Sequence, residues 1–327
     1  MELYSKEEAI QRMNRFGKGD EAFLFAVNFD QSRSFVELLK DINPEELLYA
    51  FPGCSNGGNL KTVRPEYIEW KTMPEPLESY RRKFGNVMKN IHVGNSFLVN
   101  LTCAVPVKTN LSVKEIFALS DAPYRLWMRN RFVCFSPETF VRIKGGCISS
   151  YPMKGTIAAS LPDAENVLMS DPKEIAEHAT VVDLIRNDLS QVADNVHVSR
   201  YRYVERLQTN KGDILQTSSE ISGELPEDYR SHIGDIIFSQ LPAGSITGAP
   251  KPKTVEIIRE SEDYYRGFYT GVAGICCRGE LVSAVLIRFA GQTENGLIFK
   301  AGGGITCNSV CEDEYNEIIQ KAYVPLH

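Results

Sequence analysis

The amino-acid sequence predicts an α+β fold in which large antiparallel sheets are flanked by helices. Strand-like runs outnumber helical runs, and they follow one another through short turns. The clearest example is residues 267–301, where the turn pairs Arg278-Gly279 and Asn295-Gly296 separate apolar runs, a pattern typical of a β-meander. We therefore expect antiparallel pairing rather than a doubly wound parallel sheet.

The composition indicates one large domain with a shorter N-terminal piece. Of the 327 residues, 43% are hydrophobic and 24% are charged, and no compositional break separates two independent units. We predict a shortened N-terminal segment at residues 1–76, packed on a main domain at residues 77–327. The formal net charge of −6 is spread without long runs of one sign, which argues against a nucleic-acid partner.

The sequence also argues against membrane insertion and export. No run reaches the roughly 18 consecutive apolar residues of a membrane helix, and residues 1–8 lack the apolar core of a signal peptide. The eight cysteines form no CxxC pair, so reduced thiols are expected rather than a zinc site or a disulfide framework. A cytoplasmic protein without a membrane role is the expectation.

The first third of the chain alternates helical and strand-like patterns. Amphipathic spacing predicts helices at residues 6–16 and 77–92. Apolar runs predict a buried strand at residues 21–30, a short element at residues 34–39 and a strand at residues 66–72.

The middle of the chain is predicted to consist mostly of strands. They are expected at residues 97–107, 125–135 and 139–143 and in a run ending at Lys154, with a short helix at residues 112–120. A longer helix is expected from residue 172 to about residue 192. Asp171 can cap it, Pro172 suits its first position and Glu174 stands at the third.

The last third is predicted to contain strands at residues 196–206 and near Ile221, and helices at residues 229–239 and 252–260, before the meander. A final helix is expected after Ser309, whose spacing to Glu312 fits a capping box.

Lys154 and Glu138 are the first candidates for chemistry. Lys154 lies in the stretch YPMKGT, where a strand meets a loop. It is either an exposed cation or a nucleophile, and the second role requires a population of neutral amine. Glu138 follows Ser136-Pro137 in a turn between neighbouring strands. It is either a surface turn residue or a general acid whose pKa is raised by burial.

Two pairs of glutamates stand three residues apart on predicted helices, so that each pair shares a helix face. The pairs are Glu174 with Glu177 and Glu314 with Glu317, and Lys321 lies four residues beyond the last of them. Each pair could belong to a solvated face with a salt bridge. If the two pairs converge, they could instead hold a hard divalent ion such as Mg²⁺.

Two further features suit an anionic ligand. The glycines Gly302, Gly303 and Gly304 follow a strand and could let a carboxylate approach backbone N–H groups, unless they form a plain turn. Arg288 lies in an apolar strand at residues 281–290 and needs an anionic partner, from a ligand or from the protein, if it faces inward. The turn at residues 244–251 lacks the spacing of a nucleotide-binding loop.

Together these motifs resemble the chorismate-utilising enzymes, the family of anthranilate synthase component I, aminodeoxychorismate synthase component I, isochorismate synthase and salicylate synthase. The resemblance covers about residues 80–327 and is strongest to the aminodeoxychorismate synthase members. It is carried by residues 136–138, 152–156, 176–189, 242–251, 266–271, 287–288, 301–305 and 314–317.

The resemblance implies large antiparallel sheets flanked by helices, with Mg²⁺ held between the two glutamate helices and bridging to a carboxylate of chorismate. By position, Glu177 and Glu317 are implied as the main metal ligands, supported by Glu174 and Glu314. The residues at positions that hold substrate carboxylates or their surroundings are Thr156, Tyr269, Arg288, Gly302, Gly303, Gly304 and Lys321.

The residue at position 154 separates activities within this family. Anthranilate synthases have alanine there, whereas aminodeoxychorismate synthases typically have lysine, as this chain does. The resemblance implies that the Lys154 amine attacks ring carbon 2 with loss of the 4-hydroxyl, assisted by Glu138, and that ammonia then adds at carbon 4 and displaces the lysine. The product would be 4-amino-4-deoxychorismate, the precursor of 4-aminobenzoate for folate. A separate glutamine amidotransferase subunit would supply the ammonia.

The chain departs from the family pattern at two positions and in its length. Leu98 stands where aminating members have glutamine and water-adding members have lysine, and Gln216 stands where histidine is common. The short N-terminal segment disfavours a complete regulatory tryptophan pocket. Anthranilate synthesis, isochorismate synthesis and a catalytically silent family member are therefore the alternatives.

Overall fold

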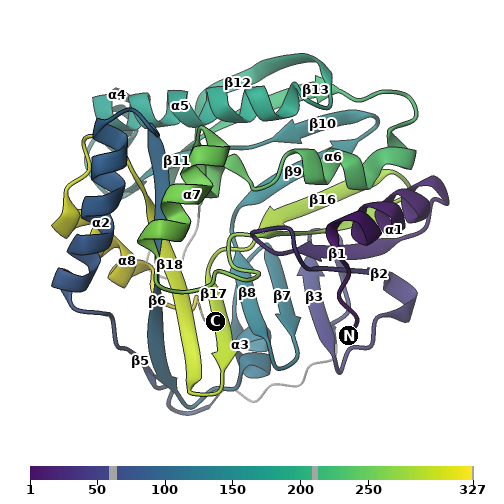
Figure 1. The fold of residues 1–327 in the computed structure, drawn as a ribbon, viewed down its shortest axis with the longest axis horizontal. Coiled ribbons are helices and arrows are strands. Elements are labelled where there is room, and N and C mark those ends of the chain that lie inside the picture. The colour runs from purple at the N-terminus through teal and green to yellow at the C-terminus, as the bar shows by residue number, and fades with distance from the viewer. Residues whose placement is uncertain (59–64, 208–212, 326–327) are drawn as a thin grey trace.

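In a computed structural model, which describes residues 1–58, 65–207 and 213–325, the chain folds into two nine-stranded sheets with helices around them (Figure 1). Every pairing between named strands is antiparallel. The predicted fold class is confirmed. None of the described helices is long and apolar enough to cross a membrane.

The first sheet joins segments from both ends of the chain. Its strands, in spatial order, are β11 (Met153–Ala158), β13 (Ile214–Glu224), β10 (Cys147–Ser150), β9 (Thr139–Lys144), β16 (Glu280–Val285), β15 (Val272–Cys277), β1 (Phe23–Val27) and β2 (Ser34–Leu38), with β12 (Asp194–Leu207) also paired to β13.

The second sheet contains Gly302, Gly303 and Gly304 inside a strand, whereas they were predicted to follow one. Its strands, in spatial order, are β14 (Gly248–Ala249), β6 (Leu98–Thr109), β18 (Gly296–Ile305), β17 (Phe289–Thr293), β8 (Phe132–Ser136), β7 (Tyr124–Met128), β3 (Leu47–Phe51) and β4 (Cys54–Ser55), with β5 (Trp70–Thr72) also paired to β6.

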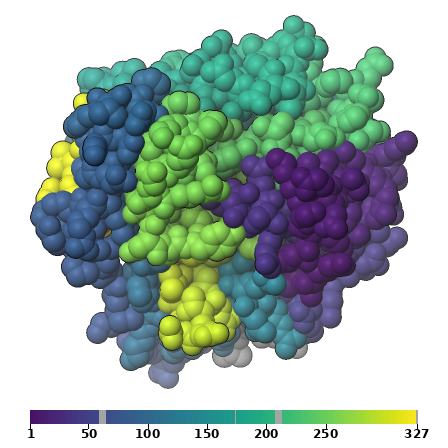
Figure 2. Space-filling model, in the orientation of Figure 1, coloured from purple at the N-terminus to yellow at the C-terminus, as the bar shows by residue number. Residues whose placement is uncertain are grey.

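The two sheets face one another across a hydrophobic core, and helices cover their outer faces. Alternation along β1 shows why: Leu24 and Ala26 join the core between the sheets, whereas Phe23 and Phe25 pack on the other face, in the core that includes residues of α1 (Lys6–Lys18). In the space-filling view the purple N-terminal residues lie against the green segment of the chain, consistent with the packing of α1 on α6 (Ile233–Ser239) (Figure 2).

The remaining helices fall into two groups. On the second sheet, α2 (Leu77–His92) packs against α7 (Lys251–Ser261) and α8 (Cys311–Lys321), and α3 (Val113–Leu119) packs on β7 and β8. Along β11 and β13 of the first sheet lie α4 (Ala164–Ser170) and α5 (Pro172–Leu189). The 3₁₀ turns are η1 (Leu39–Asp41), η2 (Tyr229–His232) and η3 (Gly244–Ile246).

Several predicted elements are confirmed. The helix at residues 77–92 has the predicted bounds, and α5 begins as predicted, since the Asp171 carboxylate accepts a hydrogen bond of 3.2 Å from the Glu174 backbone N–H. The N-terminal strands belong to both sheets, with β1 paired to β15 and β3 paired to β7. The proposed division at residue 76 stays a prediction.

Other predictions about elements are wrong. The strand predicted at residues 125–135 is a hairpin of β7 and β8, which turns at Asn130 with φ of 56°. The helix α4 was not predicted. The final helix has no capping box, because its N-cap is Val310 and the Ser309 hydroxyl instead accepts from the Thr306 N–H.

The predicted meander at residues 267–301 is also wrong in one respect. Its two hairpins, β15–β16 and β17–β18, lie in different sheets, and the chain crosses between them at residues 286–288. Arg288, predicted to lie within a strand, lies at this crossing with φ of 51°. The crossing therefore places Arg288 where the two sheets meet.

Candidate active site

A cavity of about 560 Å³ lies where β11 of the first sheet, β18 of the second sheet and the helices α5 and α8 come together. All of the predicted site residues line it: Glu138, Lys154, Thr156, Glu174, Glu177, Tyr269, Arg288, Gly302, Gly303, Gly304, Glu314, Glu317 and Lys321. The structure thus brings together residues up to 183 positions apart in the sequence (321 minus 138). The chemical roles of these residues stay predictions.

Lys154 lies near the start of β11 and not at the end of a strand. The register of β11 against β13 shifts between Lys154 and Thr156, where Gly155 has φ of 75°. Its amine lies 3.7 Å from a carboxylate oxygen of Glu177, and a quarter of its side chain is exposed. A Cβ added to Gly155 would lie 3.0 Å from a Glu174 carboxylate oxygen. Glycine at 155 therefore permits both the left-handed backbone and the approach of α5.

The prediction that Glu138 lies in a turn between neighbouring strands is wrong, because β8 before it and β9 after it belong to different sheets. Glu138 lies where the chain crosses between them, and it is held by a residue from a distant turn. The Ser245 hydroxyl, in η3, donates a hydrogen bond of 2.7 Å to its carboxylate. Burial raises the pKa of Glu138 above its usual range, while the Ser245 hydrogen bond and the charges of Lys154, Arg288 and Lys321 act in the opposite direction. A raised pKa keeps more of this carboxyl protonated near neutral pH, as a proton donor needs.

The two predicted glutamate pairs face the cavity from α5 and α8. A Cβ added to Gly303 would lie 3.0 Å from a Glu314 oxygen and 3.8 Å from a Glu317 oxygen. Glycine at 303 therefore lets this pair approach β18 closely. Lys321 forms an ion pair with Glu317 and donates a hydrogen bond of 3.0 Å to the Gly302 carbonyl.

The donor chemistry of these glutamates fits a hard divalent ion, because all four groups are carboxylates around one cavity. In the described part of the chain, however, no three His, Cys, Asp or Glu side chains are already gathered closely enough to hold a metal. Glu177 and Glu317 are instead ion-paired with Lys154 and Lys321. Metal binding at this site would therefore require the two carboxylates to exchange these lysines for the ion.

Arg288 and Tyr269 form another part of the wall. The Arg288 guanidinium lies 5.8 Å from the centre of the Tyr323 ring, and no carboxylate of a described residue forms an ion pair with it. The Tyr269 ring packs 5.8 Å from the Phe289 ring, and burial raises the pKa of its hydroxyl. Tyr269 is therefore a neutral hydrogen-bonding group beside a cation that has no ion-pair partner among the described residues.

Polar residues that were not predicted also line the cavity, among them Asn100, Ser245, Lys300 and Gln320. Ser245 lies in a turn that contributes to the family resemblance and lacks the spacing of a nucleotide-binding loop, but the sequence analysis assigned no role to its hydroxyl. Lys300 lies two residues before Gly302 and four before Gly304 on β18, so the three share one face of the strand. This spacing is the feature of the sequence from which Lys300 could have been predicted to face the cavity.

The two departures from the family pattern take different positions. Leu98 does not line the cavity, but a Cβ added to Gly304 would lie 3.0 Å from one of its methyl groups. Gln216 lines the cavity and donates through its amide to the Met153 sulfur at 3.1 Å.

A solved structure supports the likeness in fold. The menaquinone-specific isochorismate synthase from Escherichia coli superposes with a TM-score of 0.77 at 20% sequence identity, covering 98% of this chain and 82% of that chain. At this identity the likeness concerns the fold alone.

Sequence relatives fall into two groups. An uncharacterized PabA-like protein of Pasteurella multocida (strain Pm70) is 48% identical over 318 residues, which cover 97% of this chain and 98% of the relative. Anthranilate synthase component 1 of Acetivibrio thermocellus is 32% identical, with 82% of this chain and 60% of the relative covered. Aminodeoxychorismate synthase component 1 of Bacillus subtilis (strain 168) is 30% identical, with 80% and 58% covered.

The match to a family model decides the family. Residues 7–327 match the model described as chorismate binding enzyme. This match includes both sheets and every residue of the cavity wall described above. The chain therefore belongs to the chorismate binding enzyme family.

Proposed function

We propose that this protein aminates chorismate to 4-amino-4-deoxychorismate, with ammonia from a glutaminase partner and through an intermediate bound covalently to Lys154. The observation that carries the proposal is the position of the Lys154 amine, which faces the same cavity as the half-buried carboxyl of Glu138 and the two glutamate pairs. A nucleophile and a proton donor on one cavity are the two groups that replacement of a hydroxyl requires.

The proposed reaction has two displacements. In the first, the neutral Lys154 amine forms a bond to ring carbon 2, both conjugated ring double bonds shift, and the bond from carbon 4 to its hydroxyl breaks. The hydroxyl leaves as water after it takes a proton from Glu138. In the second, ammonia forms a bond to carbon 4, both ring double bonds shift back, and the bond between carbon 2 and the lysine nitrogen breaks, which restores the neutral amine. Nitrogen replaces oxygen with no net change in oxidation state, so no redox partner is needed.

Glu177 and Glu317, supported by Glu174 and Glu314, are the residues that would hold Mg²⁺. A bound Mg²⁺ would neutralise a substrate carboxylate and the acidic side chains around it. Thr156, Tyr269 and Arg288 would hold the substrate together with the Gly302–Gly304 backbone, and Lys321 would remain beside it. The Lys154 amine is ion-paired with Glu177, so separation of this pair would free it to reach the substrate.

The proposed partner follows from the need for ammonia. A glutamine amidotransferase subunit would release it from glutamine, and the net reaction would transfer an amide nitrogen to chorismate. We propose a cytoplasmic setting, in which a separate lyase would convert the product to 4-aminobenzoate for folate synthesis.

The test is a product analysis that needs no partner. The protein is incubated with chorismate, Mg²⁺ and an ammonium salt, a 4-amino-4-deoxychorismate lyase is added, and the aromatic products are separated by chromatography. We expect 4-aminobenzoate. Anthranilate or isochorismate as the sole product would contradict the proposal. Absence of any product would indicate a catalytically silent family member.

Lys154→Ala tests the covalent step. We expect 4-aminobenzoate formation to fall by at least about a thousandfold, as for removal of a nucleophile. Mass spectrometry of wild-type protein mixed with chorismate and no ammonia should show an adduct on the peptide that contains Lys154. Unchanged turnover in the variant would show that the lysine is not the nucleophile.

A further inference from the structure

Lys300 is a cavity residue to which neither the motifs nor the proposed reaction assigns a role. It lies on β18 directly opposite Phe289 of β17, and its ammonium lies 5.5 Å from the centre of the Phe289 ring and 5.2 Å from that of Tyr264. The Tyr269 ring packs on the same Phe289. Lys300 and Tyr269 therefore lie beside the same ring, and both line the cavity, as does Arg288, the residue before Phe289.

The hydrogen bonds of Lys300 are incomplete within the protein. Its ammonium donates to the backbone carbonyls of Tyr265 at 3.1 Å and Arg266 at 2.7 Å. An ammonium has three hydrogens, and no described carboxylate forms an ion pair with this one. One N–H is therefore available to a ligand in the cavity that Lys300 lines.

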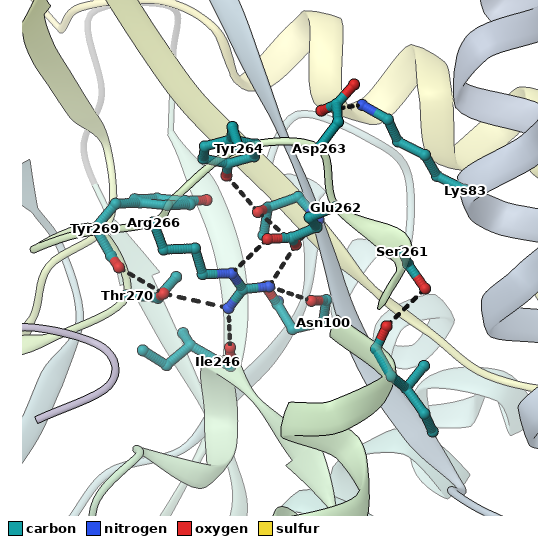
Figure 3. A network of polar contacts seen from close by, with 12 residues as sticks. Lys83, Asn100, Ile246, Ser261, Glu262, Asp263, Tyr264, Arg266, Tyr269 and Thr270 are labelled. Atoms are coloured by element: carbon teal, nitrogen blue, oxygen red, sulfur yellow. Dashed lines mark hydrogen bonds and ion pairs between the residues drawn. The ribbon is translucent and has the colours of Figure 1, made fainter. Parts of the chain in front are cut away.

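The other buried cation behind this wall, Arg266, is fully occupied. Its guanidinium contacts both carboxylate oxygens of Glu262 at 2.6 and 2.8 Å and donates to the carbonyls of Asn100 and Ile246 (Figure 3). The Glu262 charge is thus neutralised at short range by Arg266 and not by Lys300. This network holds in place residues 265–266, whose backbone carbonyls accept hydrogen bonds from the Lys300 amine. Lys300, which has no ion-pair partner among the described residues, is therefore the cation that can bind an anionic ligand.

We propose that Lys300 binds a carboxylate of the substrate at the Tyr269 end of the cavity, together with Arg288. This inference rests on the proposed function, because chorismate carries two carboxylates. One would lie at the glutamate end, and the other would lie across the cavity between Arg288 and Lys300. A lysine at this position would thus select for a dianionic substrate.

The electrostatics of the site agree with this assignment. Burial lowers the pKa of Lys300 to about 8, with Glu262 acting to raise it and Arg266 acting to lower it. In the protein without substrate, the Lys300 amine is therefore only about half protonated near pH 8. An anion bound beside it favours the charged form, so substrate binding at pH 8 takes up to about half a proton from the buffer.

The experiment measures binding and proton uptake without turnover. Chorismate is titrated calorimetrically at pH 8 with Mg²⁺ into Lys154→Ala protein, in two buffers of different ionisation enthalpy, with and without Lys300→Gln. We expect Lys300→Gln to weaken binding by about ten- to a hundredfold and to abolish the proton uptake. Lys144→Gln, which removes an exposed lysine outside the cavity, serves as the control and should change neither quantity.

Lys300→Arg separates binding from a purely structural role. Arginine keeps the charge but cannot lose its proton near pH 8, so binding should be retained within about tenfold while the proton uptake disappears. Equal affinity and equal proton uptake in the Lys300→Gln protein and its parent would overturn the assignment of Lys300 and leave the proposed function standing. No proton uptake by the parent on binding chorismate would also overturn it. No binding of chorismate by the wild-type protein would overturn both proposals.

Discussion

At the scale of single residues, two glycines set how closely the acidic helices approach the strands of the cavity. Gly155 and Gly303 face carboxylate oxygens from different helices, each 3.0 Å from the position that a Cβ would take. A Cβ at that distance requires the carboxylate to move away by a few tenths of an ångström. The glutamates and these glycines therefore form one structural unit, although the sequence separates them.

Gly303→Ala tests this unit. The added methyl group should displace Glu314 and raise the Mg²⁺ concentration for half-maximal turnover by about tenfold, as for other changes beside metal ligands. The increase in melting temperature on adding Mg²⁺ should shrink in parallel. Gly85→Ala is the matched control, because nothing lies within 4 Å of its added Cβ. An unchanged Mg²⁺ dependence of turnover in Gly303→Ala would show that Glu314 does not contribute to Mg²⁺ binding.

Ser245→Ala should change the pH profile through Glu138. The Ser245 hydrogen bond favours the carboxylate and so lowers the pKa of Glu138, while burial raises it. Without the hydroxyl the pKa rises further, and the protonated acid persists to higher pH. The alkaline limb of kcat/KM should therefore move upward by about half to one pH unit. A limb that stays in place or moves to lower pH would contradict the role of Glu138 as the general acid.

At the scale of elements, the sequence predicted the helices and strands that local residue patterns determine. It did not predict the features that are set by contacts between distant segments. Amphipathic spacing located the helix at residues 77–92, and the cap residues located the start of α5. The hairpin of β7 and β8 was missed, because its turn at residues 129–131 contains neither glycine nor proline and relies on Asn130 in a left-handed conformation.

The division of the C-terminal hairpins between two sheets could not be predicted for a different reason. A strand pattern with a period of two shows which residues share a face but not which sheet the strand joins. The same limit applies to the site. The residue types of Lys154, Glu138 and the glutamates pointed to their chemistry, whereas the contact between Glu138 and Ser245 spans 107 positions and has no local signature.

Asp171→Ala tests the element that carries Glu174 and Glu177. Loss of the cap of α5 should lower the free energy of unfolding by about 1 kcal/mol, measured by urea denaturation. Turnover should also fall, because fraying of the first turn displaces Glu174 and loosens the helix at the turn that carries Glu177. Asp183→Asn, in an exposed pair 2.7 Å from Arg186 on the same helix, should change stability by less than about 0.5 kcal/mol. Equal effects of the two variants would show that Asp171 is not the cap.

At the scale of the whole molecule, the buried network around Arg266 ties the second sheet to the loops that complete the cavity. Its guanidinium contacts Glu262, the carbonyls of Asn100 in β6 and Ile246 in η3, and the Thr270 hydroxyl beside Tyr269. It also stacks 4.6 Å from the centre of the Phe29 ring in the N-terminal part of the chain. One side chain therefore joins four segments that are distant in sequence.

Breaking this network should destabilise the whole fold, because the ion pair is only 2% exposed on each side. Glu262→Gln leaves the Arg266 charge buried without a counter-charge, and a loss of about 3–5 kcal/mol in the free energy of unfolding is expected. Chemical denaturation followed by circular dichroism measures it. The control is Glu46→Gln, in an exposed pair 2.8 Å from Arg129, which should cost less than about 0.5 kcal/mol. A cost for Glu262→Gln as small as that of the control would show that neutral hydrogen-bond acceptors are enough to satisfy Arg266. The sheet and the loops would then be held together by their apolar contacts.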